Sequence, residues 1–280
     1  MSKRNALLVV HPTRAEALSA AAEFATALFK KSFTVFTNQT IPQTTIFNDE
    51  KVEVVVVLGG DGTILRAAEL TRDQDCPILG VNLGHVGFLA EIDRPTLSEI
   101  ANSIGTGAFT VEERMSLNYQ LIRSGNQIES GWALNEVLIE RNDHQMIDLF
   151  VQIDHRPLSR WWCDSVICAT PTGSTAYAYS AGGPVVWPEV DALVLLPLAA
   201  HALFSRAMVV SPQAEIVIDL ASNSADLNAD GIRRTKLQLN DRIILTSAKE
   251  DVLLAHIRAA TFTDRLVAKF KLPIEGWRGE

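Results

Sequence analysis

Residues 54–63, Val-Val-Val-Val-Leu-Gly-Gly-Asp-Gly-Thr, decide the fold class of this 280-residue chain. The unbroken apolar run predicts a strand that is buried on both faces, as in a parallel sheet covered by helices. A segment with helical spacing, residues 64–70, follows it. The glycines therefore stand where a strand gives way to a helix, which is where open α/β sheets bind ligands.

The turn itself, Gly59-Gly60-Asp61-Gly62-Thr63, has the composition of a ligand-binding loop. Glycines allow close approach of the backbone to a ligand and a positive φ. The turn lacks the Gly-Lys-Ser/Thr ending of a Walker loop and the GxGxxG spacing of a dinucleotide fingerprint. It resembles the signature shared by NAD kinases, diacylglycerol and sphingosine kinases and, more distantly, 6-phosphofructokinases. Alone, it favours phosphoryl transfer over a purely structural turn.

The composition is that of a folded globular protein, with 47% hydrophobic and 21% charged residues. The net charge of −8 argues against a nucleic-acid partner or an anionic membrane partner. No apolar run approaches the roughly 18 residues of a membrane span, and no signal peptide is recognisable. The three cysteines form no CxxC pair, so we expect buried thiols and a cytoplasmic location.

The first hundred residues alternate strand and helix signals. The predicted strands are residues 6–10, 33–36, 52–58 and 78–81, and the predicted helices are residues 15–29, 64–70 and 97–104. This alternation predicts βαβ units, and hence an α/β domain with a doubly wound, mostly parallel sheet.

From Phe109 onward the pattern changes to short alternating runs separated by turn signals, which predicts antiparallel strands. Examples are residues 117–122, 216–220 and 243–246, and one helix is expected near 174–180. We place the domain limit at residues 105–107, giving an α/β domain at 1–107 and a β-rich domain at 108–257. Helical spacing returns at 263–270, so residues 258–280 are expected to pack back on the first domain.

Two polar motifs in the second half are candidates for binding. Asn135-Glu136 begins a strand and can hydrogen-bond two neighbouring hydroxyls, as on a ribose, although a polar strand end is a common alternative. Residues 170–177, Thr-Pro-Thr-Gly-Ser-Thr-Ala-Tyr, follow a predicted strand. Ser174 or Thr175 can cap the helix expected there. Four hydroxyls in six residues exceed the needs of a cap, which favours a ligand site.

Together these motifs resemble the NAD kinases: GGDGT at 59–63, NE at 135–136, and TPTGSTAY at 170–177 followed by SAGGP at 180–184. Residues 80–89, 201–209 and 264–270 are also similar to segments of that family, so the resemblance covers nearly the whole chain. It implies an α/β N-terminal domain, a β-rich, sandwich-like C-terminal domain, and NAD between them. The implied reaction is phosphorylation of the adenosine 2′-hydroxyl of NAD to give NADP.

The resemblance also implies roles for individual residues. Asp61 is the expected general base, which orients the 2′-hydroxyl and accepts its proton late in phosphoryl transfer. Asn135 and Glu136 are expected to hold the ribose hydroxyls, and Tyr177 to stack on a base. The remaining expected contacts to NAD or the phosphoryl donor are Gly59, Gly60, Gly62, Thr63, Asp164, Thr172, Gly173, Ser174, Thr175 and Ala176.

The phosphoryl donor implied by the resemblance is ATP, inorganic polyphosphate or both, accompanied by a divalent cation, expected to be Mg²⁺. The sequence shows no dedicated metal site, which fits a cation carried by the donor. A homodimer or homotetramer is expected. Two positions depart from the family: Ser165 stands where glycine is usual, and Ile232 follows Asp230-Gly231, so Asp230 is left out of the predicted site. A diacylglycerol-type lipid kinase and an inactive NAD(P) sensor stay as alternatives, which an assay for NADP formation would separate.

Overall fold

The computed structural model describes residues 4–38, 51–81, 87–90, 96–222, 224–258 and 260–274. The chain divides into two compact units, residues 1–113 with 252–280, and residues 114–251. Of the predicted features, residues 82–86 in the family-like segment 80–89 and residues 275–280 lie outside the described residues.

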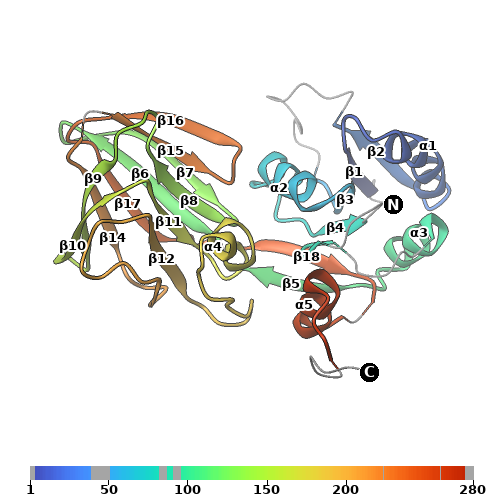
Figure 1. Ribbon diagram of the computed structural model, residues 1–280. Coiled ribbons are helices and arrows are strands. Elements are labelled where there is room, and N and C mark those ends of the chain that lie inside the picture. The colour runs from blue at the N-terminus through green and yellow to red at the C-terminus, as the bar shows by residue number, and fades with distance from the viewer. Residues whose placement is uncertain are drawn as a thin grey trace. The chain divides into compact units, whose positions relative to one another are not determined.

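The first unit contains one sheet and four described helices (Figure 1). The strands, in sheet order, are β2 (Phe33–Thr37), β1 (Arg4–Val10), β3 (Val54–Leu58), β4 (Ile78–Val81), β18 (Val252–His256) and β5 (Thr110–Arg114). The helices are α1 (Ala15–Phe29), α2 (Asp61–Leu70), α3 (Leu97–Thr106) and α5 (Phe262–Phe270).

Strands β1 to β4 and β18 pair in parallel, and this confirms the predicted α/β sheet. Every residue of β3 is buried, because helices cover both faces of the sheet. Helices α1 and α3 pack on one face with Leu8 and Val56, while α2 packs on β3 and β4 from the other. The apolar run at residues 54–58 therefore forms the strand, covered on both faces, that the sequence predicted.

The register brings the carboxyl ends of β1, β3 and β4 to one edge of the sheet. Leu58 pairs with Val10 on one side and Val81 on the other. The N–H of Gly59 then donates to the carbonyl of Val81, at 3.2 Å between N and O. The turn at residues 59–63 is thus fixed to the sheet edge at which parallel α/β folds bind ligands.

The second unit contains two six-stranded sheets whose paired strands are antiparallel. The first, in sheet order, consists of β10 (Arg156–Cys163), β9 (Ile147–Ile153), β14 (Ile216–Leu220), β17 (Arg242–Ser247), β6 (Leu117–Arg123) and β7 (Asn126–Ala133). The second consists of β13 (Met208–Val210), β12 (Leu193–Leu198), β11 (Ser165–Ala169), β8 (Glu136–Glu140), β15 (Ser224–Ala229) and β16 (Arg233–Gln238). The short helices η1 (Gly173–Thr175) and α4 (Tyr177–Ser180) complete the unit.

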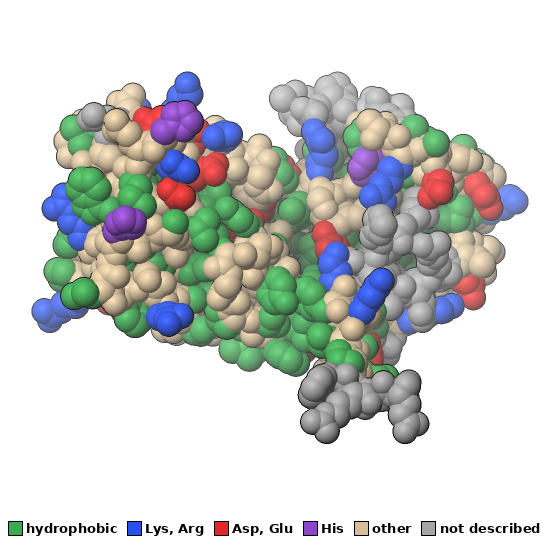
Figure 2. Space-filling view, viewed as in Figure 1, with side chains coloured by type: hydrophobic (Ala, Val, Ile, Leu, Met, Phe, Trp, Pro, Cys, Tyr) green, Lys and Arg blue, Asp and Glu red, His purple; other side chains and the backbone are tan. Residues whose placement is uncertain are grey.

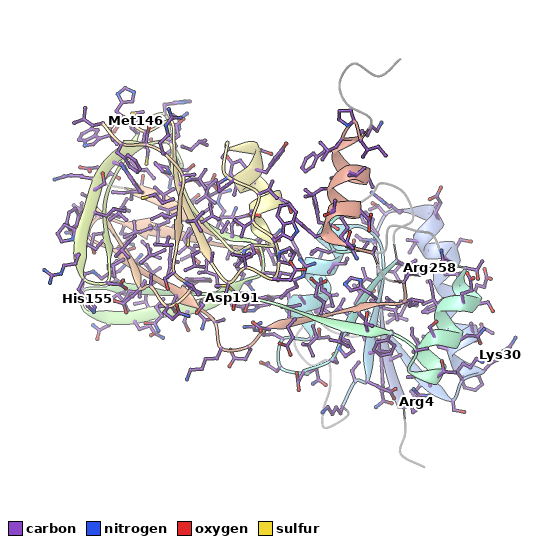
Figure 3. All side chains as sticks on the ribbon, turned by 90° about the horizontal axis from the view of Figure 1, so that it is seen from below. Arg4, Lys30, Met146, His155, Asp191 and Arg258 are labelled. Carbon is purple, nitrogen blue, oxygen red and sulfur yellow. The ribbon has the colours of Figure 1, made fainter. Side chains whose placement is uncertain are left out.

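Alternate residues from both sheets form one hydrophobic core, which confirms the sandwich-like fold. Trp161 and Tyr119 are its largest side chains and are almost completely buried. Figure 3 shows side chains filling the space between the two sheets. The aligned packing of two sheets with alternating inward residues is the usual way to build such a core.

Most predicted elements lie within a few residues of their observed limits, and α1 and β4 match the prediction at both ends. Helix α3 runs past Gly105 and ends at Thr106, and the next residue, Gly107, has the left-handed conformation of a C-cap. The predicted limits of the domains differ by six residues from the two junctions of the units, because β5 and β18 belong to the first sheet. The helix expected near 174–180 is present but shorter, as α4, since Ala176, at φ −98° and ψ −124°, separates it from η1.

The three cysteines are buried free thiols, as predicted. Burial raises the pKa of Cys163 and of Cys168 to about 12. Among the helices of the described ranges, none is both long and apolar enough to cross a membrane.

Candidate functional site

Asp61 is the first residue of α2 and lies directly after the buried strand β3. Its side chain is half-buried, and its carboxylate accepts two backbone hydrogen bonds from a neighbouring segment. The N–H of Phe88 donates to Oδ2 at 2.9 Å, and the N–H of Leu89 donates to Oδ1 at 3.2 Å. Both oxygens are therefore oriented by the backbone, and the helix N-terminus favours the negative charge.

Gly87 lies against the same carboxylate. A Cβ built on Gly87 would lie 2.1 Å from Oδ1 of Asp61, so a larger residue there would displace the carboxylate. Residues 87–90 thus approach Asp61 closely enough to hold it because position 87 has no side chain. Gly87 belongs to the segment that resembles the family, but only the structure shows its contact with Asp61.

The glycines of the turn do not adopt the positive φ that the sequence analysis allowed for them. Gly59 is needed for packing, because a Cβ there would lie 2.4 Å from Oγ1 of Thr63. Gly60 and Gly62 face open space, with no described atom within 4 Å of a built Cβ. Thr63 is buried, and its N–H donates to the carbonyl of Gly60 at 2.8 Å. The turn therefore exposes backbone at two of its three glycines.

In the second unit, Glu136 is the first residue of β8 and Asn135 directly precedes it. A third residue holds both in place. The carboxylate of Asp230 accepts from the N–H groups of Leu134 and Asn135 at 2.7 Å each, and from Glu136 at 3.2 Å. Asp230 has φ 55° and stands with Gly231 in the turn between β15 and β16. It thus fixes the backbone of the motif, although the sequence analysis left it out.

The segment 170–177 packs against the same residues. A Cβ on Gly173 would lie 2.0 Å from the carbonyl oxygen of Asn135, so only glycine fits there. The N–H of Thr170 donates to that oxygen at 2.9 Å. The backbone N–H of Tyr177 lies close enough to the Glu136 carboxylate to act against the rise of its pKa. In the sequence, 33 residues lie between the two motifs. The structure brings the motifs together, because Glu136 pairs with Ala169 where β8 and β11 lie side by side.

The hydroxyls of this segment bind the protein itself. Thr170 Oγ1 donates to the carbonyl of Leu134, and Thr175 Oγ1 donates to that of Thr172. Ser174 Oγ donates to the carbonyl of Pro171 and accepts from the N–H of Val186. Capping by Ser174 or Thr175 was a wrong prediction, since neither side chain caps η1 or α4.

A buried arginine supports the remaining hydroxyl. The Arg114 Nη1 group donates to Oγ1 of Thr172 at 3.4 Å, and both residues are buried. The number of hydroxyls in segment 170–177 therefore has a structural cause, because they hold the loop in place.

Near Asn135 and segment 170–177, the carboxyl of Glu136 has a strongly raised pKa. Its Oε2 atom is buried and has no hydrogen-bond partner among the described residues. Burial, and then repulsion by the Asp230 carboxylate, raises the pKa of Glu136 to about 7, while the N–H of Tyr177 acts in the opposite direction. Burial also raises the pKa of Asp230, against the effect of its three N–H donors and Arg233. Such a perturbed carboxyl is typical of functional sites.

Asp164 lies away from Glu136. Glu136 pairs with Ala169 at one end of β11, whereas Asp164 precedes Ser165 at the other end. Five strand steps, about 17 Å, thus separate Asp164 from the position of Glu136 along the sheet. Asp164 Oδ1 forms an ion pair with Arg141 Nε at 3.0 Å.

The two departures from the family pattern have local explanations. Ser165 is a buried strand residue and does not have a positive φ, so glycine is not required there. Near Ile232, Arg233 turns inward: its guanidinium lies 5.0 Å from the ring centre of Trp132 and 3.9 Å from Asp230 Oδ2.

Among the residues that the structure describes, no group of three or more His, Cys, Asp or Glu side chains could hold a metal ion. His201 is exposed, and its N–H donates to the carbonyl of Trp162 at 2.8 Å.

Comparisons with known proteins agree with this architecture. Two family models match the chain: the ATP-NAD kinase N-terminal domain over residues 37–109 and the ATP-NAD kinase C-terminal domain over residues 134–257. An NAD kinase of Thermobifida fusca is 50% identical, over 81% of this chain and 72% of the relative. An NAD kinase of Cutibacterium acnes is 41% identical, over 98% of this chain and 92% of the relative.

Two solved structures have a similar fold. A yeast NADH kinase in complex with NADH has a TM-score of 0.90 at 23% identity, covering 99% of this chain and 90% of that one. An NAD kinase from Archaeoglobus fulgidus in complex with ATP has a TM-score of 0.73 at 25% identity, covering 96% and 98%.

Proposed function

This chain belongs to the NAD kinase family, and from that premise we propose how its residues carry out the phosphorylation of NAD to NADP. The observation that carries the proposal is the geometry of Asp61. Asp61 stands at the start of α2, and the N–H groups of Phe88 and Leu89 hold its carboxylate. Two glycines beside it face open space. That arrangement leaves room for a substrate next to an oriented base. Family membership decides against the lipid-kinase alternative.

Asp61 is the proposed general base for the adenosine 2′-hydroxyl of NAD. Its oxygens retain lone pairs after accepting the two backbone bonds, so a hydroxyl can donate to the same carboxylate. The base orients the hydroxyl and takes its proton as the new phosphorus–oxygen bond forms. The exposed backbone at Gly60 and Gly62, with Gly59 and Thr63 shaping the turn, is proposed to approach the phosphates.

Asn135 and Glu136 are the proposed contacts to the ribose hydroxyls, and they select which hydroxyl reacts. The buried Oε2 of Glu136 supports this role, because a ligand hydroxyl would satisfy it. Residues 172–177 are proposed to line the nucleoside next to them, with the half-exposed Tyr177 stacking on a base. Asp164 is proposed to contact the other end of the dinucleotide, since it lies at the far end of β11.

ATP is the proposed phosphoryl donor, in keeping with the ATP complex of the Archaeoglobus fulgidus relative, and inorganic polyphosphate is proposed as a second donor. A divalent cation, proposed to be Mg²⁺, would neutralise charge on the transferring phosphoryl group. The described side chains offer no cluster of carboxylates and histidines for it, so we assign the cation to the donor phosphates.

We also propose a homodimer or homotetramer in the cytoplasm. Several large apolar side chains of the second unit are exposed, among them Trp162, Leu203, Phe204 and Val209. Hydrophobic side chains are frequent on the face of this unit in Figure 2. Exposed apolar residues of this size are typical of subunit interfaces.

The chain is also proposed to fold as two domains, residues 1–107 with 258–280 and residues 108–257. Limited proteolysis tests these domain limits.

The test is a coupled assay on the purified chain with NAD, Mg²⁺ and either ATP or polyphosphate. An NADP-specific dehydrogenase reports the product. NADP formation with ATP is expected, and a parallel reaction with polyphosphate defines the second donor. If NAD raises the melting temperature but neither donor yields NADP, the chain is a binding protein and the proposed catalytic role of Asp61 is wrong.

A further inference from the structure

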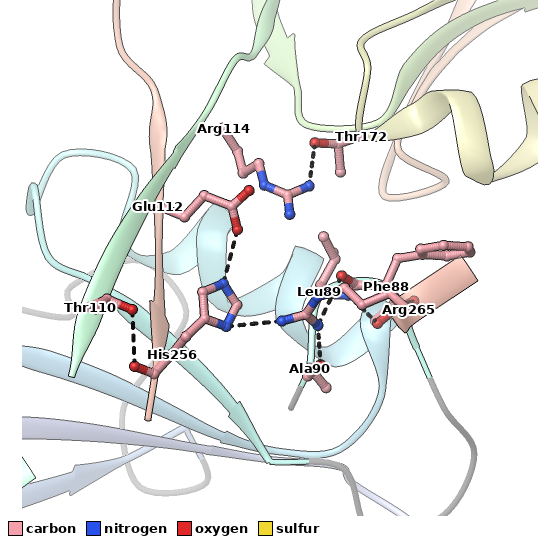
Figure 4. A network of polar contacts seen from close by, with 10 residues as sticks. Phe88, Leu89, Ala90, Thr110, Glu112, Arg114, Thr172, His256 and Arg265 are labelled. Carbon is pink, nitrogen blue, oxygen red and sulfur yellow. Dashed lines mark hydrogen bonds and ion pairs between the residues drawn. The ribbon is translucent and has the colours of Figure 1, made fainter. Parts of the chain in front are cut away.

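We infer that Arg265 of the last helix is a positioning residue for Asp61, acting through residues 88–90. The inference rests on the proposed role of Asp61 as general base. Its elements belong to the first unit: Asp61 on α2, the short segment 87–90, and α5. Figure 4 shows Arg265 beside Phe88 and Ala90. Arg265 lies more than two hundred residues from Asp61 in the sequence, and the sequence analysis gave it no role.

The guanidinium of Arg265 binds the segment that holds Asp61. Its Nη1 group donates to the carbonyl oxygen of Phe88 at 3.3 Å and to that of Ala90. The N–H groups of Phe88 and Leu89 donate in turn to the Asp61 carboxylate. Phe88 thus contacts Arg265 with its carbonyl and Asp61 with its N–H group, and its neighbours Ala90 and Leu89 each add one of these contacts. The arginine therefore fixes where the donors to Asp61 point.

Aromatic packing adds a second attachment between α5 and the segment. The Phe88 ring lies 5.9 Å from that of Phe262 and 5.7 Å from that of Phe270, measured between ring centres. Phe262 and Phe270 are the first and last residues of α5, and Arg265 stands between them. The helix therefore holds Phe88 by both its ring and its carbonyl.

Arg265 is itself held in place by a hydrogen-bonded chain. It is almost fully buried, and its Nη2 group lies 3.1 Å from Nδ1 of His256. A guanidinium has only donors, so Nδ1 accepts and the proton of the neutral ring is on Nε2. Nε2 then donates to Oε2 of Glu112 at 3.0 Å. A buried, oriented guanidinium of this kind cannot be replaced by lysine without loss of donors.

A purely structural role, docking α5 on the sheet, is the competing explanation. Arg4 offers a matched control, because it also binds two backbone carbonyls in the first unit. Its Nη1 donates to Gly105 O at 2.9 Å and its Nη2 donates to Ile104 O at 3.3 Å. Figure 3 shows Arg4 far from α5. Loss of either arginine removes bonds to carbonyls, but only Arg265 acts on the segment at Asp61.

The experiment compares Arg265→Ala with Arg4→Ala, each in the wild-type chain and in an Asp61→Asn background. We expect Arg265→Ala to lower kcat by up to about 100-fold, as for a reacting group displaced by ~1 Å, with little change in KM for NAD. Arg4→Ala should leave kcat unchanged. In the Asp61→Asn background, Arg265→Ala should cause no further loss, because two residues that act as a unit are not additive.

Amide hydrogen exchange provides a readout that does not depend on turnover. In Arg265→Ala, the N–H groups of Phe88 and Leu89 should exchange faster than in the Arg4→Ala variant. If Arg265→Ala does not fold, Arg265→Lys is measured in the same way, since it keeps the charge but not the paired donors.

Equal losses in the two arginine variants, or a full Arg265 effect that persists in the Asp61→Asn background, would overturn the inference. Failure of the proposed function looks different. In that case the wild-type chain makes no NADP, or Asp61→Asn retains its rate, whatever the arginine variants do.

Discussion

The turn at residues 59–63 and the segment at residues 170–177 use polar groups in opposite ways. In the first, the carboxylate of Asp61 is held from outside by another segment, and the turn keeps exposed backbone at Gly60 and Gly62. In the second, the hydroxyls hold the loop to itself and to Leu134. In this chain the cluster of hydroxyls stabilises a loop, whereas the proposed general base is a single acid in a glycine turn.

The largest effect of this difference between the two sites is expected for Asp61→Asn. If the first site supplies the chemistry, kcat should fall by about 10²- to 10⁴-fold, the usual contribution of a general base. Binding of NAD should persist, because the amide keeps the size of the carboxylate. Steady-state kinetics and isothermal titration calorimetry measure the two effects. A variant that turns over near the wild-type rate would contradict the assignment.

Glu136→Gln tests the buried carboxyl of the second site. The folded chain binds the Glu136 proton more tightly than the unfolded chain, because the pKa is raised from 4.5 to about 7. Wild-type stability should therefore fall as the pH rises through this window, and the loss should be complete above pH 7. Relative to wild type, the variant should gain up to about 3 kcal/mol between low and high pH.

Urea denaturation from pH 5 to pH 8 measures that difference. Glu140→Gln, on the same strand, controls for adding an amide to β8. A difference between Glu136→Gln and wild type that is independent of pH would show that Glu136 is ionised throughout.

Two glycine substitutions test the difference between the tightly packed Gly173 and the open Gly60. Gly173→Ala forces a Cβ against the carbonyl of Asn135 and should cost about 1–3 kcal/mol, as overpacked sites do. Gly60→Ala meets no described atom within 4 Å and should leave stability unchanged. Thermal denaturation of both variants is the measurement. Equal destabilisation by the two would remove the distinction.

The smallest effect is expected for Thr175→Ala. Its hydroxyl donates to the carbonyl of Thr172, so its loss should cost about 0.5–1.5 kcal/mol. If the hydroxyl serves the loop, stability should fall without a specific loss of NAD affinity, and Thr175→Ser should restore it. A large rise in KM for NAD at unchanged stability would instead assign that hydroxyl to the ligand.

Local patterns were enough to predict the sheet of the first unit, because buried parallel strands require continuous apolar runs such as residues 54–58. They also located the turn and the motif at Asn135, since strand ends with acids or amides are visible in the sequence. What local patterns missed depends on contacts between distant segments. The helix expected near 174–180 is interrupted at Ala176 because the loop at 170–177 packs on residues 134–136. These contacts outweigh the helical spacing of the loop sequence.

Asp230 illustrates a signal that was available. Asp-Gly between two strands commonly marks a tight turn with positive φ, and the side chain of Asp in such a turn is well placed to bind backbone N–H groups. That the N–H groups belong to residues 134–136 is a matter of strand order, which no local pattern shows. Arg265 is harder still, because an arginine in an amphipathic helix is usually solvent-exposed.

The discontinuity of the first unit has a consequence for how the chain is made. Strand β18, which pairs with β4, leaves the ribosome about 170 residues after it. At ordinary rates of translation, this interval lasts on the order of 10 s. During that time the edge of β4 lacks its final neighbour, and an unpaired edge invites association with other chains. The kinase therefore completes its first sheet, and the support for Asp61, only about 170 residues after β4 has been made.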